Sequence, residues 1–135
     1  MSDERRCEEC SVGIAIVEDE KALVDVYRRI FAKRGIHVCF VAFDGREAVE
    51  KFILCMPRPR VILMDHRLPT MTGIEATREI LRIDTSARII FLSADVGVKD
   101  EALRAGAVEF LKKPAGLRDI LQAVEKYTGS MQIAK

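Results

Sequence analysis

Residues 60–65 read RVILMD, a nearly continuous apolar run that ends in a carboxylate. A short apolar run between polar residues is typical of a strand that is covered on both faces of a sheet. Two further runs, IAIV at 14–17 and IIFL at 89–92, have the same character. Strands buried on both faces are characteristic of parallel sheets, because the connecting helices pack on the faces. The chain is therefore expected to have an α/β fold.

Segments with helical spacing separate these runs and two weaker ones. The expected strands are Val12–Val17, His37–Ala42, Arg60–Met64, Arg88–Leu92 and Ala107–Leu111. The expected helices are Glu20–Lys33, Gly45–Leu54, one from the N-cap Thr72 to about Leu81, Lys99–Ala105, and one from Leu117 to Tyr127. Asp44 is a predicted N-cap, and Thr72 with Glu75 has capping-box spacing. The strand–helix unit repeats five times, which predicts a doubly wound, five-stranded parallel sheet.

Length and composition fit one globular domain and exclude several other classes. The 135 residues are 49% hydrophobic and 32% charged, which excludes an intrinsically disordered chain. The net charge of +1 gives no overall attraction to nucleic acids or anionic membranes. There is no signal-peptide pattern and no apolar run long enough to cross a bilayer. We expect a flexible tail at 1–11, one domain at 12–127 and a tail at 128–135, in the cytoplasm.

Polar side chains follow the predicted strands at the points where they end. Glu18 and Asp19 follow the first strand, and Asp65 follows the third. Ser93 follows the fourth strand, and Lys113 lies just beyond the fifth. The carboxyl ends of parallel strands meet at one edge of the sheet, so these groups should converge. Each has an ordinary alternative as a cap or a solvated side chain, but clustered carboxylates together predict a site for Mg²⁺.

Four segments occur in a characteristic order: VEDE at 17–20, MDHRLPTMTG at 64–73, FLSA at 91–94 and GAVEFLKKP at 106–114. With them the chain resembles the receiver domain of two-component response regulators across about Val12–Tyr127. The resemblance implies a flavodoxin-like (βα)5 fold with strand order 2-1-3-4-5. It also implies a signalling domain rather than an enzyme. Such a domain accepts a phosphoryl group from a sensor histidine kinase or a phosphotransfer protein and then switches partner binding.

The resemblance also implies roles for the residues at the strand ends. Asp65 matches the phosphoacceptor. The ion, Mg²⁺ or Mn²⁺, would be bound by Glu18, Asp19, Asp65 and the backbone carbonyl of Arg67. Glu18 stands where the family more often has aspartate, which lengthens the reach to the metal by one methylene.

Further positions match the phosphoryl-binding and switch residues of the family. Lys113 and Ser93 match the groups that contact the phosphoryl oxygens, and Ser93 and Phe110 match the switch pair. Phe110 stands in place of the commoner tyrosine and lacks its hydroxyl. Pro114 matches a proline that follows a cis peptide bond. Arg67 and Asp95 should border the pocket, close enough for an ion pair.

The output surface is expected on the fourth helix, the fifth strand and the fifth helix. Its exposed residues should include Val98, Arg104, Glu109 and Arg118. Because Ser93 and Lys113 bracket the fourth helix and fifth strand in the sequence, movement at the phosphoryl site should reach this surface first. The expected target is a protein, with no direct binding to nucleic acid and no membrane insertion.

A flavodoxin-like FMN carrier would need a hydroxyl- and Gly-rich loop after the first strand to bind the phosphate, whereas VEDE at this position would repel it. An atypical receiver would bind partners without phosphorylation, but this sequence lacks none of the residues that phosphorylation requires. A phosphatase of the haloacid dehalogenase type needs an acid or base two residues after the nucleophile, where this chain has Arg67. Cys7 and Cys10 form a CxxC, but zinc needs four ligands and no second pair is near in sequence. We interpret this pair as part of the tail, and Cys39 and Cys55 as packing residues.

Overall fold

A single parallel sheet organises the chain, which we describe from a computed structural model over residues 13–128. The strand order is β2-β1-β3-β4-β5. All neighbouring pairs are parallel, which confirms the predicted fold class and strand order. The strands are β1 (Ile14–Val17), β2 (Val38–Ala42), β3 (Val61–Asp65), β4 (Arg88–Ser93) and β5 (Glu109–Lys112).

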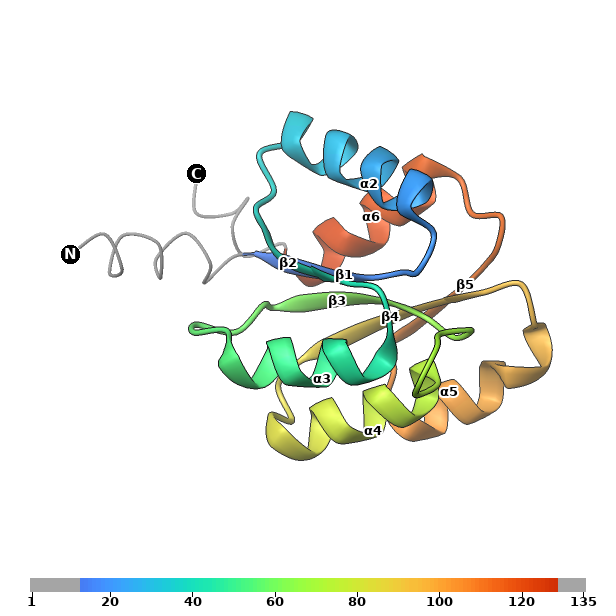
Figure 1. Cartoon of the computed structure of the whole chain (residues 1–135). Coiled ribbons are helices and arrows are strands. Elements are labelled where there is room, and N and C mark those ends of the chain that lie inside the picture. The colour runs from blue at the N-terminus through green and yellow to red at the C-terminus, as the bar shows by residue number, and fades with distance from the viewer. Residues whose placement is uncertain (1–12, 129–135) are drawn as a thin grey trace.

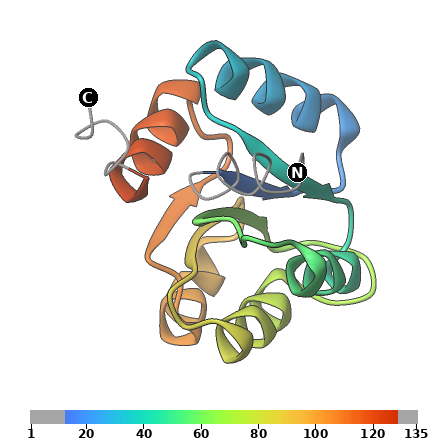
Figure 2. The same ribbon diagram turned by 90° about the vertical axis from the view of Figure 1, so that its left-hand side faces the viewer.

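Helices cover both faces of the sheet. They are α2 (Lys21–Lys33), α3 (Gly45–Leu54), α4 (Gly73–Ile83), α5 (Lys99–Ala105) and α6 (Leu117–Tyr127), with a short 3-10 helix η1 (Val96–Val98) that was not predicted. Figures 1 and 2 show α2 and α6 on one face and α3, α4 and α5 on the other. None of the helices within residues 13–128 is long and apolar enough to span a membrane. The predicted tail at 1–11, with Cys7 and Cys10, lies outside the described residues, as does 129–135.

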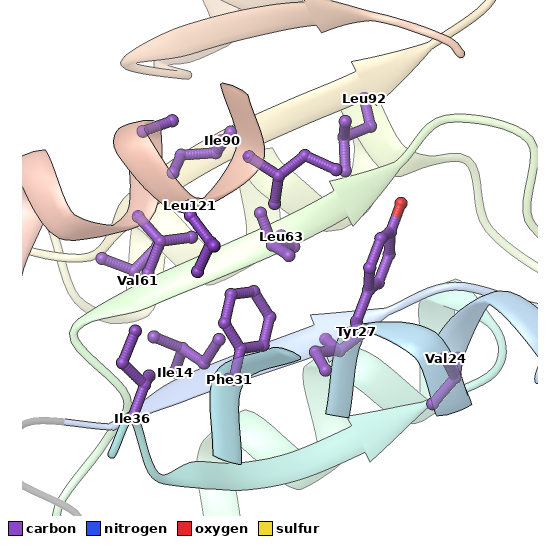
Figure 3. Packing of buried hydrophobic residues seen from close by; sticks show 14 of the residues in the cluster. Ile14, Val24, Tyr27, Phe31, Ile36, Val61, Leu63, Ile90, Leu92 and Leu121 are labelled. Atoms are coloured by element: carbon purple, nitrogen blue, oxygen red, sulfur yellow. The ribbon is translucent and has the colours of Figure 1, made fainter. Parts of the chain in front are cut away.

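Two apolar clusters, one on each face of the sheet, explain why the strands are apolar throughout. Val61 and Leu63 of β3 pack in the cluster under α2 and α6, part of which Figure 3 shows. Ile62 and Met64 pack in the cluster under α3, α4 and α5. Successive side chains of a strand point to opposite faces, so both must be apolar where both faces are covered.

Side-chain caps fix the starts of two helices that follow strands. Asp44 Oδ1 accepts a hydrogen bond from the backbone N–H of Glu47 at 2.7 Å, at the start of α3. Thr72 Oγ1 accepts from the N–H of Glu75 at 3.1 Å, and Glu75 Oε1 accepts from the N–H of Thr72 at 3.0 Å. Both caps were predicted and are confirmed. Helix α4 runs to Ile83, two residues beyond the predicted end, because Asp84 still donates its N–H to the Ile80 carbonyl.

Removal of the Thr72 hydroxyl should destabilise the fold measurably. In Thr72→Ala the N–H of Glu75 loses its acceptor, and the expected loss is about 1 kcal/mol in the free energy of unfolding. Urea denaturation followed by circular dichroism measures it. Thr72→Ser keeps the hydroxyl and is the matched control. Equal midpoints for the alanine and serine variants would show that the cap contributes nothing.

Candidate functional site

Three carboxylates converge at the carboxyl ends of β1 and β3. Asp65 is the last residue of β3, and Glu18 and Asp19 follow β1 directly. One carboxylate oxygen from each lies within 4.8 Å of those of the other two. Glu18 and Asp65 are buried and Asp19 is exposed, so the cluster opens to solvent on one side. The predicted acidic cluster therefore exists in the fold, and its all-oxygen donor set suits a hard divalent cation.

Lys113, which follows β5, reaches across the sheet edge to this cluster. Its Nζ donates to Glu18 Oε1 at 2.9 Å and to Asp65 Oδ1 at 3.2 Å. Burial raises the pKa of Glu18 and of Asp65, and Lys113 opposes this while neighbouring carboxylates add to it. Burial tends to lower the pKa of Lys113, but Glu18 and Asp65 outweigh it and raise that pKa. Lys113 therefore stays a cation that contacts Asp65.

A phenol lies near the cluster that the sequence analysis did not connect with it. Tyr27 of α2 is buried in the core, and Figure 3 places it beside the carboxyl end of β3. Burial and the nearby Glu18 carboxylate raise the pKa of Tyr27 to about 12. In the sequence Tyr27 is one apolar position of an amphipathic helix, so only the fold could reveal this proximity.

Ser93 ends β4 at the rim of the same edge. It is buried, and its Oγ accepts the backbone N–H of Asp95 at 3.0 Å. Its carbonyl accepts the N–H of Lys113 at 2.9 Å, so the two residues are tied together through the backbone. The Lys113–Pro114 peptide bond is cis.

The expected ion pair between Arg67 and Asp95 does not form in the described part of the chain. Both side chains are exposed, and Asp95 instead caps η1, where its Oδ1 accepts the N–H of Gly97 at 2.8 Å. A nearby backbone donor thus holds the carboxylate that was expected to meet Arg67.

An aromatic stack runs inward from the predicted switch residue. The Phe110 ring stacks on the Phe91 ring, with their centroids 6.2 Å apart. The centroid of the Phe91 ring also lies 5.8 Å from that of the His66 ring. The His66 ring therefore packs beside Phe91. Sequence reasoning missed Phe91, because a phenylalanine in an apolar strand carries no signal beyond packing.

The predicted output face is partly less exposed than expected. Arg104 and Arg118 are exposed, but Val98 and Glu109 are only half-exposed. Val98 packs against the cluster under α3, α4 and α5. Glu109 Oε1 accepts the Tyr127 hydroxyl at 3.0 Å, which holds the carboxylate against α6.

The comparison with protein families identifies the chain. The model of the response regulator receiver domain matches residues 14–125. The chain belongs to this family. Chemotaxis protein CheY of Thermotoga maritima is 36% identical over 115 residues, which is 84% of this chain and 94% of that protein. The dehalogenase-type phosphatase alternative is therefore set aside.

Two solved structures show the same architecture. A CheY of Borrelia burgdorferi, in a complex with CheX, beryllium fluoride and magnesium, has a TM-score of 0.80 and 31% identity, over 84% of this chain and 87% of that chain. The receiver domain of sensor kinase PA1611 of Pseudomonas aeruginosa, with magnesium in its active-site cleft, has a TM-score of 0.76 and 32% identity, over 87% and 97%. This receiver domain is a signalling domain of a two-component system, with Glu18, Asp19 and Asp65 positioned for Mg²⁺ and phosphoryl-aspartate binding.

Proposed function

We propose that this receiver domain accepts a phosphoryl group on Asp65 from a phosphohistidine of a sensor kinase or phosphotransfer protein, in the cytoplasm. The observation that carries the proposal is the contact of Lys113 with Asp65 inside a cluster of three carboxylates. A cation beside a buried carboxylate favours its ionised form, which attacks phosphorus without a general base. Lys113 thus offsets part of the effect of burial, which raises the pKa of Asp65.

The transfer exchanges one bond for another. An Asp65 oxygen forms a bond to phosphorus while the phosphorus–nitrogen bond of the donor breaks, and its electron pair stays on the imidazole. Lys113 then pairs with a phosphoryl oxygen, since its Nζ already lies 3.2 Å from Asp65 Oδ1. Positioning and neutralisation of oxygen charge are the contributions that phosphoryl transfer needs from a protein.

The same carboxylates would bind the metal ion. Glu18, Asp19 and Asp65 fit Mg²⁺ or Mn²⁺ by their number, their oxygen donors and their mutual proximity, and the Arg67 carbonyl is proposed as a further ligand. When bound, the ion neutralises negative charge on the carboxylates and on the phosphoryl oxygens. Lys113 contacts two of these carboxylates and would share them with the ion.

Labelling with a small phosphodonor tests the proposed function. Incubation with acetyl phosphate and Mg²⁺ should add one phosphoryl group, seen by intact-mass spectrometry, and peptide mapping should place it on Asp65. A chelator should prevent the labelling, because the carboxylate cluster would then repel the donor. If no Mg²⁺ or Mn²⁺ concentration supported labelling, the atypical receiver that works without phosphorylation would be the better description.

We further propose that Ser93 and Phe110 switch the surface formed by α5, β5 and α6. A phosphoryl oxygen on Asp65 would accept a hydrogen bond from the Ser93 hydroxyl and draw this side chain away from the Asp95 N–H, which its Oγ now accepts at 3.0 Å. Loss of that bond would loosen η1, where Asp95 is the cap. Movement of Ser93 would open space that Phe110 enters from its stack on Phe91. The exposed residues Leu103, Arg104 and Arg118 would present this change to a protein target.

Chemical shifts should follow this route. With beryllium fluoride and Mg²⁺ as the phosphoryl mimic, backbone amide shifts beyond the pocket should concentrate between Ser93 and Arg118. Helix α5 is short and buries only Ala102 fully, so a small free energy is enough to move it. Fluoride and Mg²⁺ without beryllium are the control. Distant shifts on α2 and α3 instead would show that the signal leaves by another face.

A further inference from the structure

A cleft opens at the edge of the sheet where β3 and β4 begin. Its volume is about 640 Å³, within the range of about 300–1,000 Å³ that is typical of small-molecule sites. The segments that lead from α3 into β3 and from α4 into β4 line it. Figure 1 shows the ends of α3 and α4 at this edge of the sheet. The acidic cluster lies at the other ends of the strands, so the two sites are separate.

Three arginines line this cleft, which we call the arginine cleft: Arg58, Arg60 and Arg88. Arg60 directly precedes β3, and Arg88 is the first residue of β4. The Arg88 N–H donates to the Arg60 carbonyl at 3.2 Å, so their backbones lie side by side. Arg88 Nη1 also donates to the Ser86 carbonyl at 3.2 Å. Because a guanidinium group stays charged at any ordinary pH, positive charge gathers here although the whole chain carries only +1.

Asp84 is the one acidic side chain among the described residues that line the cleft. Its Oδ1 accepts the Ser86 N–H at 2.9 Å and the Ser86 hydroxyl at 2.6 Å. Its Oδ2 lies 3.9 Å from Arg58 Nη1, which is close enough for an ion pair but too far for a hydrogen bond. Of the three arginines, Arg58 alone pairs with a carboxylate within residues 13–128. The positive charge of the cleft is therefore only partly balanced.

Arg58 is held in position by its surroundings. Its guanidinium carbon lies 5.3 Å from the centroid of the buried Phe52 ring, in a cation–π contact. Pro57 and Pro59 flank it, and their fixed φ angles restrict the backbone on both sides. Arg58 Nε is buried, and no described residue accepts a hydrogen bond from it. A buried donor without an acceptor is costly, and an anion bound beside it would offset that cost.

We propose that the arginine cleft binds a small molecule with two linked phosphate groups, either inorganic diphosphate or a nucleoside diphosphate. Guanidinium groups hold phosphate oxygens through paired, parallel hydrogen bonds, which makes arginine the side chain best suited to this chemistry. A diphosphate offers oxygens to all three guanidinium groups, whereas a single phosphate offers fewer. The volume of the cleft also leaves room for a nucleoside.

A bound diphosphate would join the starts of β3 and β4 to the segment after α3. Because such a ligand binds only the folded chain, it would also stabilise the fold by mass action. The site contains no residue of the acidic cluster, and the binding needs no metal ion. The proposal is therefore independent of phosphorylation at Asp65.

Isothermal titration calorimetry of the whole chain with sodium diphosphate and with adenosine diphosphate tests the proposal. Protein and buffers are first freed of divalent metal ions with a chelating resin, so that no metal-bound phosphate enters the acidic cluster. We expect one bound molecule per chain. Equal affinities would show that the diphosphate group alone is recognised, and tighter binding of the nucleotide would show that the nucleoside also contacts the cleft. Inorganic phosphate should bind about 10-fold more weakly or worse, because it makes fewer hydrogen bonds to charged groups.

Arg60→Gln and Arg88→Gln should each weaken binding of the diphosphate by about 10-fold or more, as expected for the loss of a hydrogen bond to a charged group. Both side chains are exposed, so the fold should persist, and circular dichroism checks it. Arg29→Gln is the matched control, because it removes the same charge from an exposed position of α2 outside the cleft. It should bind like the wild-type chain.

Three results would overturn the proposal. The first is that neither diphosphate nor adenosine diphosphate binds the wild-type chain at millimolar concentration. The second is wild-type affinity in folded Arg60→Gln and Arg88→Gln. The third is an equal loss in these variants and in Arg29→Gln, which would show attraction to the overall charge of the chain rather than to the cleft.

Discussion

Asp65→Asn is expected to abolish labelling by acetyl phosphate and Mg²⁺. The asparagine amide is nearly the same size, but it has no negative charge and its nitrogen lone pair is delocalised into the carbonyl. It therefore does not attack phosphorus. The fold should survive, because burial raises the pKa of Asp65. A raised carboxyl pKa means that the ionised group costs folding free energy at neutral pH, and the amide removes that cost. Intact-mass spectrometry gives the labelled fraction, and circular dichroism confirms the fold.

Asp25→Asn is the control for a loss of one carboxylate, since Asp25 lies exposed on α2. It should be labelled like the wild-type chain. Labelling of folded Asp65→Asn at the wild-type rate would place the acceptor on another residue. Partial labelling at a much lower rate would point to Glu18 or Asp19, which lie in the same cluster and bear the same chemistry.

The fold was largely predictable because strands covered on both faces are recognisable in the sequence as continuous apolar runs. Both faces of β3 are covered, so Val61 to Met64 must all be apolar, and the run is visible without any structure. The observed ends of several strands and helices differ from the predicted ends by one or two residues. Strand β1 begins at Ile14 rather than Val12, and β5 at Glu109 rather than Ala107, because strand limits depend on pairing with a neighbour. Strand order came from the family resemblance, since apolar patterns do not specify neighbours.

The convergence of the site was also predictable, but its finer contacts were not. Parallel strands bring Glu18, Asp65 and Lys113 to one edge whatever the details of their packing. The contact expected between Arg67 and Asp95 failed because Asp95 found a backbone donor two residues away. The spacing of residues in the sequence does not show whether a carboxylate will accept from a nearby backbone N–H or pair with a distant side chain.

Gly73, the first residue of α4, lies against the backbone of the proposed acceptor Asp65. Its N–H donates to the His66 carbonyl at 2.9 Å, which closes the loop after β3. A Cβ on Gly73 would collide with the backbone carbonyl of Asp65 and lie 2.9 Å from the Cα of His66. These are backbone atoms, so no side-chain rotation relieves the contact. Only a shift of the end of β3 or of the start of α4 makes room.

Gly73→Ala is therefore expected to lower the free energy of unfolding by about 1–3 kcal/mol, as overpacking does in tight sites, and to slow labelling of Asp65 several-fold. The second effect arises because the shift falls on the acceptor itself. Gly116→Ala is the control: its Cβ would find only Asp119 Oδ2, at 3.8 Å, and the cost at this helix N-cap should stay below about 1 kcal/mol. Urea midpoints and labelling rates separate the two consequences. A lower urea midpoint with the wild-type labelling rate would show that the start of α4 shifts and that Asp65 keeps its position. A wild-type midpoint together with the wild-type labelling rate would show that the close approach of Gly73 to Asp65 is not needed.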